Sequence, residues 1–336
     1  MPIREDKYQP PENPRKQYAE EIFDRLPEAE IGVDIPRVHS RLLKGGSDTK
    51  LKLSAAERMS REGWNPQLVA GTQKGDLISN SISGEVFEVG DISKARKKVR
   101  NPENGNEGLI VAEPIRIAAQ EYVYELSDNS RHSKKIKVYD TVYKNRSLAT
   151  QEFFDSLVKS IPAGCMEVFD EIAIHKLTSG TGGLFRTEGS LFSDKGIIHL
   201  YVNENLFFKE GEYPIRGATE ILYHELWHAV VKYLKGSINP GEQWRSTMRS
   251  SGKLVSQYAE KKRYPQQNDR DGEVEDIADS GKMYFATDGA NTDKTRQLRE
   301  FVAPRFEKLD GVMGQLKKRQ NMNRVMRALK KPKTLY

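Results

Sequence analysis

The stretch Ala218-Thr-Glu-Ile-Leu-Tyr-His224-Glu225-Leu-Trp-His228-Ala-Val-Val-Lys-Tyr-Leu234 contains an HExxH pattern among strong helix formers. Its apolar residues recur at helical spacing, and Gly236 follows where a helix C-cap is expected. The two histidines are four residues apart, so a helix would place their imidazoles on one face with Cβ atoms roughly 6 Å apart. That arrangement lets two nitrogens bind one Zn²⁺ at ~2.0–2.1 Å, and the sequence therefore predicts a zinc site.

A second helix is expected downstream, over residues 272–285. Glu275 and Asp279 are four residues apart and would share one face of it. We predict that Glu275 is the third zinc ligand and that Asp279 accepts the free N–H of a liganding histidine. Glu273 and Asp276 remain alternatives for the ligand.

The predicted reaction is hydrolysis of a peptide bond. A bound zinc ion would polarise the scissile carbonyl and lower the pKa of a water molecule towards ~7. Glu225 would take a proton from the attacking water and pass it to the leaving amine. A tyrosine is expected to stabilise the oxyanion, with Tyr264 and Tyr258 as candidates and Tyr284 as a weaker third.

Several other classes of protein are excluded by inventory. No third histidine follows His228, which excludes a zinc site of the HExxHxxGxxH type. Cys165 is the only cysteine, so Cys-rich zinc sites and internal disulfides cannot form. No window has the ~18 apolar residues of a membrane helix, and no nucleic-acid motif is present, so we expect no specific nucleic-acid partner. The N-terminus lacks the pattern of a secretory signal. We expect a cytoplasmic protein, or one exported without a signal peptide and delivered into a target cell.

Residues 175–310 resemble the gluzincin metallopeptidases of the anthrax lethal factor type, which include the bacterial Pro-Pro endopeptidases. The resemblance implies a zincin-like α+β fold and a zinc-dependent endopeptidase, with His224, His228 and Glu275 as ligands and Glu225 as base. It also implies an oxyanion-binding tyrosine shortly before the glutamate ligand, whereas Tyr264 lies eleven positions before it. Beyond the zinc pattern, the resemblance lies in Gln243-Trp244, Ser256-Gln-Tyr258-Ala259, Glu275-Asp-Ile-Ala-Asp279, Met283-Tyr-Phe285 and Ala303-Pro304-Arg-Phe306.

Relatives of this type pair an extended substrate with an edge strand that precedes the active-site helix. The candidate for such a strand lies in 182–190, with Gly183, Leu184 and Phe185 as substrate-binding residues. His199 falls in the next apolar run, Ile197–Val202, and is expected to be a satisfied strand histidine rather than a ligand.

Composition and patterning predict an α+β chain in four parts, with strands first and helices after. Residues 1–20 read as a disordered arm, 21–108 as an accessory region that ends in a linker, 109–315 as the peptidase domain and 316–336 as a basic amphipathic helix. Within the accessory region, Gly45-Gly46 indicates a turn, and the basic run 94–100 is expected to be a solvated linker.

The C-terminal helix carries 8 Lys/Arg among residues 317–333, although the whole chain has only 54 basic against 48 acidic residues. Met322, Val325, Met326 and Leu329 form an apolar stripe at helical spacing. We expect the stripe to dock on the domain and the basic face to be solvated. Contact with an anionic membrane, nucleic acid or an acidic partner is the alternative.

The sequence therefore predicts a zinc endopeptidase that acts on a protein or peptide substrate. Kinship to toxins suggests a virulence effector or secreted toxin, by analogy alone. Two alternatives stay open: a non-catalytic binding module on a metallopeptidase scaffold, and an adaptor that uses the basic C-terminal helix.

Overall fold

The chain forms two compact units in a computed structural model. Unit 1 comprises Met1–Ile35 and Asn239–Gly314, and unit 2 comprises Pro36–Ile238 and Gln315–Tyr336. The residues described are 35–54, 57–58, 61–64, 77–80, 86–93, 96–100, 102, 104–105, 107–111, 114–129, 132–142, 151–176, 183–187, 196–202, 215–234, 244, 255, 269–287 and 293–330.

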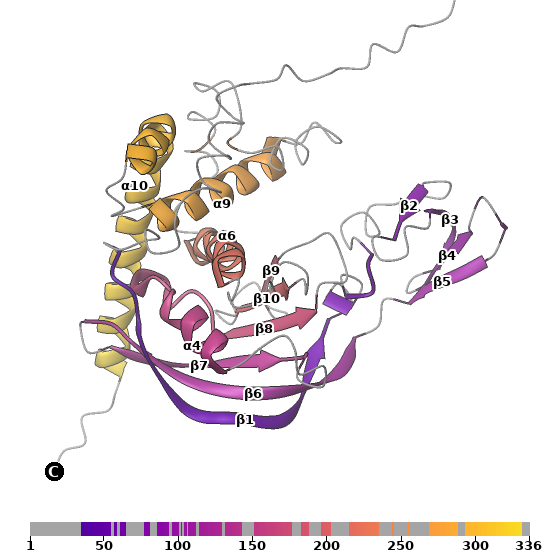
Figure 1. The fold of residues 1–336 in the computed structure, drawn as a ribbon, viewed down its shortest axis with the longest axis horizontal. Coiled ribbons are helices and arrows are strands. Elements are labelled where there is room, and N and C mark those ends of the chain that lie inside the picture. The colour runs from indigo at the N-terminus through magenta and orange to yellow at the C-terminus, as the bar shows by residue number, and fades with distance from the viewer. Residues whose placement is uncertain are drawn as a thin grey trace, which may run out of the picture. The chain divides into compact units, whose positions relative to one another are not determined.

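Unit 2 is built on a six-stranded mixed sheet in the order β1-β6-β7-β8-β10-β9 (Figure 1). β7 and β10 flank β8 in parallel, and every other pairing is antiparallel. The protein is thus mixed in helices and strands, which is compatible with the predicted α+β class. The strands are β1 (His39–Leu53), β6 (Ile115–Ser127), β7 (Ser133–Asp140), β8 (Glu171–Lys176), β9 (Gly183–Thr187) and β10 (Gly196–Val202).

The prediction of a turn at Gly45-Gly46 is wrong. Both glycines lie inside β1, where the register with β6 shifts between Leu42 and Lys44 and again between Lys44 and Ser47. A β-bulge of this kind bends a strand without reversing it. Glycine at 46 also lets the backbone approach a side chain of β6, because a Cβ there would lie 2.8 Å from the Tyr122 hydroxyl oxygen.

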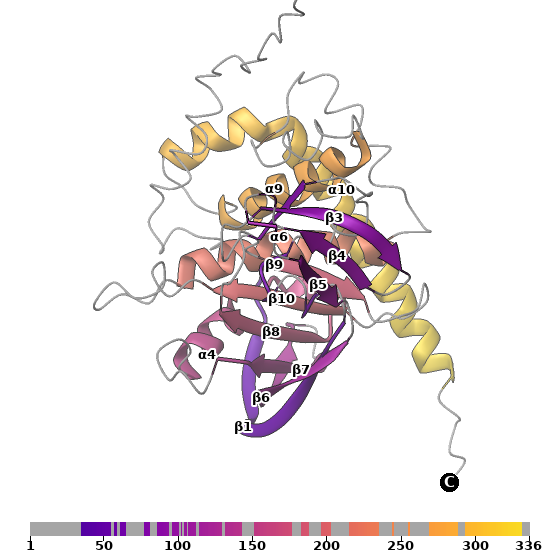
Figure 2. The ribbon, with the colours of Figure 1, turned by 90° about the vertical axis from the view of Figure 1, so that its right-hand side faces the viewer.

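A second sheet in unit 2 is a four-stranded antiparallel meander in the order β2-β3-β4-β5 (Figure 1), and Figure 2 shows β3, β4 and β5 from another side. The basic run expected to be a linker forms β4, and its partner β5 crosses the domain boundary expected at 108/109: Gly108 pairs with Val99 and Leu109 with Lys98. That boundary is therefore wrong, because it divides a hairpin. The strands are β2 (Leu77–Ser79), β3 (Val86–Ser93), β4 (Arg96–Arg100) and β5 (Glu107–Val111).

The boundary is also wrong for the larger sheet. β1 comes from the region expected to be accessory, yet it pairs with β6 along almost its whole length. Pairing between strands is decided by residues far apart in the chain, so composition along the sequence did not reveal it.

A helix and a short turn connect β7 to β8 in unit 2. α4 (Gln151–Lys159) follows β7, and the 3₁₀ turn η3 (Ala163–Cys165) follows α4. The apolar face predicted for α4 is buried as expected. α4 packs on β6 through Phe154, whose ring centroid lies 4.9 Å from that of Tyr122, and through a Tyr124 hydroxyl that donates to Asp155 at 2.7 Å.

Unit 1 contains α9 (Asp269–Thr287) and the first part of α10 (Asp293–Lys330). Its central buried group is Asp276 on α9. The Asp276 carboxylate accepts hydrogen bonds from Trp244 Nε1 at 2.7 Å, from the Val255 backbone N–H, and from Arg305 Nε at 3.1 Å. One carboxylate thereby ties α9 to α10 and to two positions between α6 and α9.

The last turns of α10 belong to unit 2 and lie against it with polar contacts. Gln320 donates to the Gly164 carbonyl and Asn323 to the Tyr233 hydroxyl, each at 2.8 Å, and Arg324 pairs with Asp128 at 3.2 Å. Met322 and Val325 point away and are exposed. The prediction that the apolar stripe docks is wrong for these residues, because the contact face is the polar one. Leu329 is among the residues whose side chains are not described.

Candidate metal centre

α6 (Ile215–Leu234) carries the HExxH pattern, and the helix predicted for it is confirmed. It packs on β9, β10 and α4. Its apolar residues are buried in the core of unit 2 before, within and after the HExxH pattern. This packing fixes which face of the helix points into the core. The fully buried ones among them are Ala218, Leu222, Leu226, Trp227, Ala229, Val230 and Leu234.

A second set of contacts fixes α6 from the side of α4. The Tyr223 hydroxyl donates to the Ser160 carbonyl at 3.1 Å, and Arg37 Nη1 donates to the same carbonyl at 3.2 Å. The Arg37 guanidinium also lies 5.2 Å from the centre of the Tyr223 ring. Burial raises the pKa of Tyr223, so its hydroxyl stays protonated as the donor. The residue next to His224 is thus held in place.

His224, Glu225 and His228 bring their ligand atoms within 4.8 Å of one another. The two Nε2 atoms are 3.0 Å apart, with ring centroids 4.7 Å apart and planes at 78°. Two nitrogens bound to one tetrahedral ion at ~2.0–2.1 Å would stand about 3.3–3.4 Å apart, so a shift of a few tenths of an ångström admits an ion. Both imidazoles are half-buried and Glu225 is buried. The donor set therefore fits zinc.

The strand expected to bind substrate is present as β9, and it lies at the edge of the six-stranded sheet. It pairs antiparallel with β10 from Gly183↔Leu200 to Thr187↔Gly196. The backbone of Gly183, Leu184 and Phe185 is thus placed at a sheet edge in contact with α6, whereas their side chains are not described.

Two other predicted site residues belong to the other unit, and two lie outside the described part of the chain. Glu275 and Asp279 are on α9 in unit 1, whereas the HExxH residues are in unit 2, so their part in the site stays a prediction. Glu275 is half-buried, and Asp279 is buried with an oxygen 4.0 Å from Lys282 Nζ. Tyr258 and Tyr264 lie outside the described residues.

The contacts of two further candidates, Asp276 as a zinc ligand and Tyr284 as the oxyanion-binding tyrosine, speak against these roles. Asp276 uses both oxygens for hydrogen bonds inside unit 1, which speaks against it as a ligand. The Tyr284 hydroxyl donates to Asp310 on an exposed part of unit 1.

The comparisons with known proteins add no name to this geometry. No family model matches the chain, and neither a curated protein nor a solved structure matches it significantly. The function therefore has to be argued from the site alone.

Sequence reasoning missed two buried polar groups that matter for the fold around the site. One is the Asp276 cluster, which no local pattern announces. The other joins Glu57 to His199, and its signal was available in Ser54-Ala-Ala-Glu57, a capping-box sequence. His199 itself behaves as expected, since it is a buried strand residue with protein partners.

Proposed function

We propose that this chain is a zinc-dependent endopeptidase with a zincin-like fold. The observation that carries the proposal is the pair of imidazoles on α6, with Nε2 atoms 3.0 Å apart and the Glu225 carboxylate beside them. Two neutral imidazoles and a third ligand with an open fourth position make the donor set of hydrolytic zinc enzymes. Glu275 is the third ligand in this proposal and Asp279 the partner of a liganding histidine.

When bound, a zinc ion supplies a Lewis acid for the scissile carbonyl and acidifies a water molecule. The chain's own residues supply the proton transfers and the alignment. Glu225 accepts a proton from the attacking water and returns it to the leaving amine. Its burial keeps bulk water away from the carboxylate, and the packed helix holds it at a fixed distance from both histidines.

The edge strand supports a peptide as the substrate. An extended peptide can add to β9 by backbone hydrogen bonds, which read the main chain and tolerate many side chains. The glycine at position 183 permits close approach of a second backbone. Because β9 contacts α6, a peptide bound there would run beside the helix that carries Glu225.

The first test measures zinc by mass spectrometry. We expect one zinc per wild-type chain, and loss of zinc in His224→Ala, His228→Ala and Glu275→Gln. His39→Ala is the matched control, because His39 is an exposed histidine that contacts Asn129. A wild-type chain that takes up no zinc, or a His224→Ala variant that keeps it, would overturn the proposal.

The second test separates catalysis from metal binding. Glu225→Gln keeps the shape of the side chain but cannot accept a proton, so we expect it to retain zinc and to lose cleavage of a peptide library by about 10²–10⁴-fold. Cleavage that survives a chelator, or that is equal in Glu225→Gln and wild type, would exclude this mechanism. A library without any cleaved peptide, together with bound zinc, would favour the non-catalytic binding module.

A further inference from the structure

The last turns of α10 have a docked face that is polar. Leu316 is buried, and the three contacts that hold the helix to unit 2 come from Gln320, Asn323 and Arg324. Arg319 adds a cation–π contact, with its guanidinium 4.7 Å from the centre of the Tyr233 ring. Side chains of successive turns thus fix which way the helix faces.

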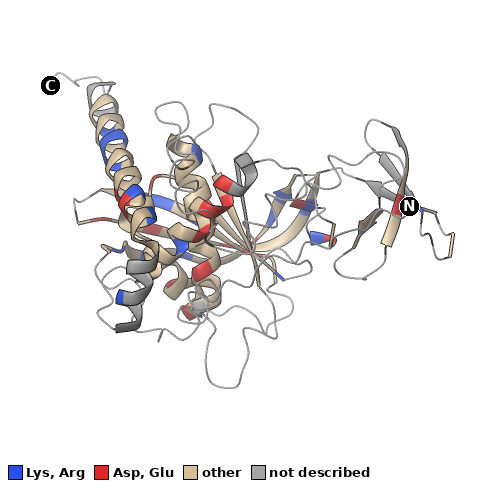
Figure 3. Ribbon diagram, turned by 90° about the horizontal axis from the view of Figure 1, so that it is seen from above, with Lys and Arg blue, Asp and Glu red and all other residues tan. Residues whose placement is uncertain are grey.

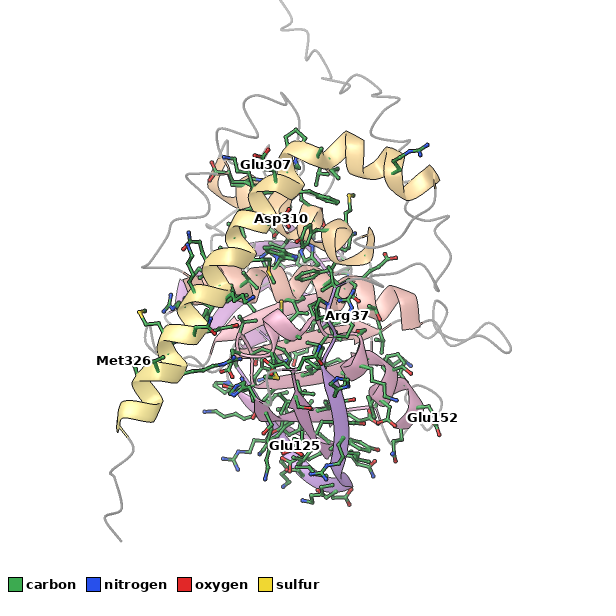
Figure 4. The ribbon with its side chains drawn as sticks, turned by 90° about the vertical axis from the view of Figure 1, so that its left-hand side faces the viewer. Arg37, Glu125, Glu152, Glu307, Asp310 and Met326 are labelled. Atoms are coloured by element: carbon green, nitrogen blue, oxygen red, sulfur yellow. The ribbon has the colours of Figure 1, made fainter. Side chains whose placement is uncertain are left out.

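The opposite face is apolar and basic. Met322 is 62% exposed, Val325 58% and Met326 49%, and Lys317 and Lys318 are exposed one turn earlier. Figure 4 shows Met326 on the outer side of the helix. Three neighbouring exposed apolar side chains on an anchored helix form a surface that water does not favour.

The charge around this surface has one sign. Asp310 is the last acidic residue of the sequence, and residues 311–336 contain 8 Lys/Arg and no Asp or Glu. Figure 3 shows the basic residues along the end of α10. A strongly basic surface attracts an anionic partner and repels a second copy of itself.

We propose that the face of α10 formed by Lys317, Lys318, Met322, Val325 and Met326 binds a bilayer surface rich in anionic lipids. Exposed methionine and valine side chains suit the boundary between headgroups and acyl chains, and flanking lysines suit anionic headgroups. Nucleic acid offers phosphates for the two lysines but little apolar surface for Met322, Val325 and Met326, so it would leave the apolar part of the face uncovered. The helix lies along the bilayer surface and does not cross it.

The experiment is flotation of the full chain with vesicles of phosphatidylcholine alone or with one third phosphatidylglycerol. We expect binding only to the anionic vesicles and a decrease as salt rises. Lys317→Gln/Lys318→Gln should bind about 30-fold more weakly, because each basic residue near such a surface contributes about 1 kcal/mol and 1.4 kcal/mol is tenfold. Met322→Ser/Val325→Ser/Met326→Ser should weaken binding by about tenfold or more.

The matched control is Leu43→Ser/Leu77→Ser/Val86→Ser, which removes three exposed apolar side chains elsewhere in unit 2 and should bind like wild type. Thermal unfolding checks that each variant is folded, and the lysine variant and the salt series decide the matter if the triple serine variant is not. Absence of binding to anionic vesicles overturns the proposal, as does equal binding by the α10 variants. If the protein does not bind vesicles but has twice the mass of one chain in solution, and the α10 substitutions restore the single-chain mass, the face binds a second copy of the chain instead.

Discussion

Glu57 and His199 form a buried ion pair, with Glu57 Oε1 3.0 Å from His199 Nε2. Glu57 is 6% exposed and His199 is fully buried on β10. Glu57 comes from the segment after β1, where a capping box holds it: Ser54 N–H donates to Glu57 Oε2 at 2.6 Å and the Ser54 hydroxyl accepts from Glu57 N–H at 3.3 Å. The pair therefore joins the end of β1 to the middle of β10.

The contact continues into β8 as a chain of hydrogen bonds. His199 Nδ1 lies 2.9 Å from His175 Nε2, and His175 Nδ1 lies 3.2 Å from the Thr141 hydroxyl, which donates to the Ile174 carbonyl at 2.9 Å. The contacts of His175 join a donor to an acceptor when its proton is on Nδ1, because Nε2 can then accept from His199 Nδ1.

Glu57→Gln should lower the free energy of unfolding of unit 2 by about 3–5 kcal/mol, because it removes the buried carboxylate that lies against His199 Nε2 and Ser54 N. Urea unfolding followed by tryptophan fluorescence measures the change. Glu62→Gln is the control, since Glu62 pairs with Arg58 at an exposed site and such pairs contribute about 0–1 kcal/mol. Equal effects of the two substitutions would contradict a structural role for the Glu57–His199 pair.

The same chain of groups predicts that acid destabilises unit 2 in two stages. Burial lowers the pKa of His175, and the charges of His199 and Arg61 lower it further. The unfolded state, with a histidine pKa of about 6.5, therefore binds the proton first as pH falls. The stability that neutral His175 supports is complete above about pH 6.5 and declines below it.

The second stage belongs to Glu57. Burial by itself would raise the pKa of Glu57, but the hydrogen bond and charge of His199 and the contacts with Ser54 lower it to about 2. Its contribution is complete above the unfolded pKa of about 4.3 and is lost as pH falls towards 2. Urea unfolding between about pH 8 and about pH 3, with a chelator present, should show both losses. His175→Gln should remove the first and Glu57→Gln the second; an unchanged pH profile in both would refute the assignment.

Asp276→Asn should destabilise unit 1 by about 3–5 kcal/mol, because the neutral amide cannot match Arg305 and also accept from Trp244 and Val255. Asp310→Asn is the control, since Asp310 accepts from Tyr284 at an exposed site and a change there should stay within about 0.5 kcal/mol. Thermal unfolding of both variants measures the difference.

The Asp276 variant also tests which acidic residue of α9 binds zinc. Held below its unfolding transition, Asp276→Asn should keep one zinc per chain, whereas Glu275→Gln should lose it. The reverse pattern would make Asp276 the ligand and would require its hydrogen bonds to Trp244 and Arg305 to break on metal binding.

Local patterns predicted the elements whose form depends on neighbours in the sequence. The helical spacing of Phe153, Phe154, Leu157 and Val158 and the high density of apolar residues in β10 are local properties, and both elements have the predicted form. The HExxH pattern is also local, because four residues of helix suffice to bring His224 and His228 together.

Features that depend on distant partners were missed. The pairing of β1 with β6 requires strands to choose partners far along the chain. The hairpin of β4 and β5 is local, but the basic run in β4 lacks the apolar alternation that predicts a strand. The rotation of α10 is set by Asp128, Gly164 and Tyr233, which lie about 90 to 200 residues before it and turn its polar side inward. An amphipathic pattern indicates that a helix has an apolar and a polar face, but it does not predict which face contacts the rest of the protein.

The bulge in β1 offers a test of such a long-range constraint. At Gly46 a Cβ would lie 2.8 Å from the Tyr122 hydroxyl oxygen and 2.9 Å from the ring carbon that bears it, whereas at Gly45 it would meet nothing within 4 Å. Tyr122 cannot easily withdraw, because its ring packs against Phe154 with centroids 4.9 Å apart. Gly46→Ala should therefore cost about 1–3 kcal/mol of unfolding free energy through overpacking, and Gly45→Ala should cost less than about 1 kcal/mol.

Urea unfolding of the two alanine variants measures this contrast, and Tyr122→Phe gives the means to trace it. Removing the hydroxyl relieves the closest contact of the new methyl group, so Gly46→Ala should be less destabilising in a Tyr122→Phe background by about 0.5–3 kcal/mol, the coupling expected of residues in contact. If the two glycine substitutions cost the same, or if Tyr122→Phe leaves the cost of Gly46→Ala unchanged, then β1 does not press against β6 at the bulge. The glycines would then serve only the bend of the strand, and the register shifts on either side of Lys44 would be their sole structural reason.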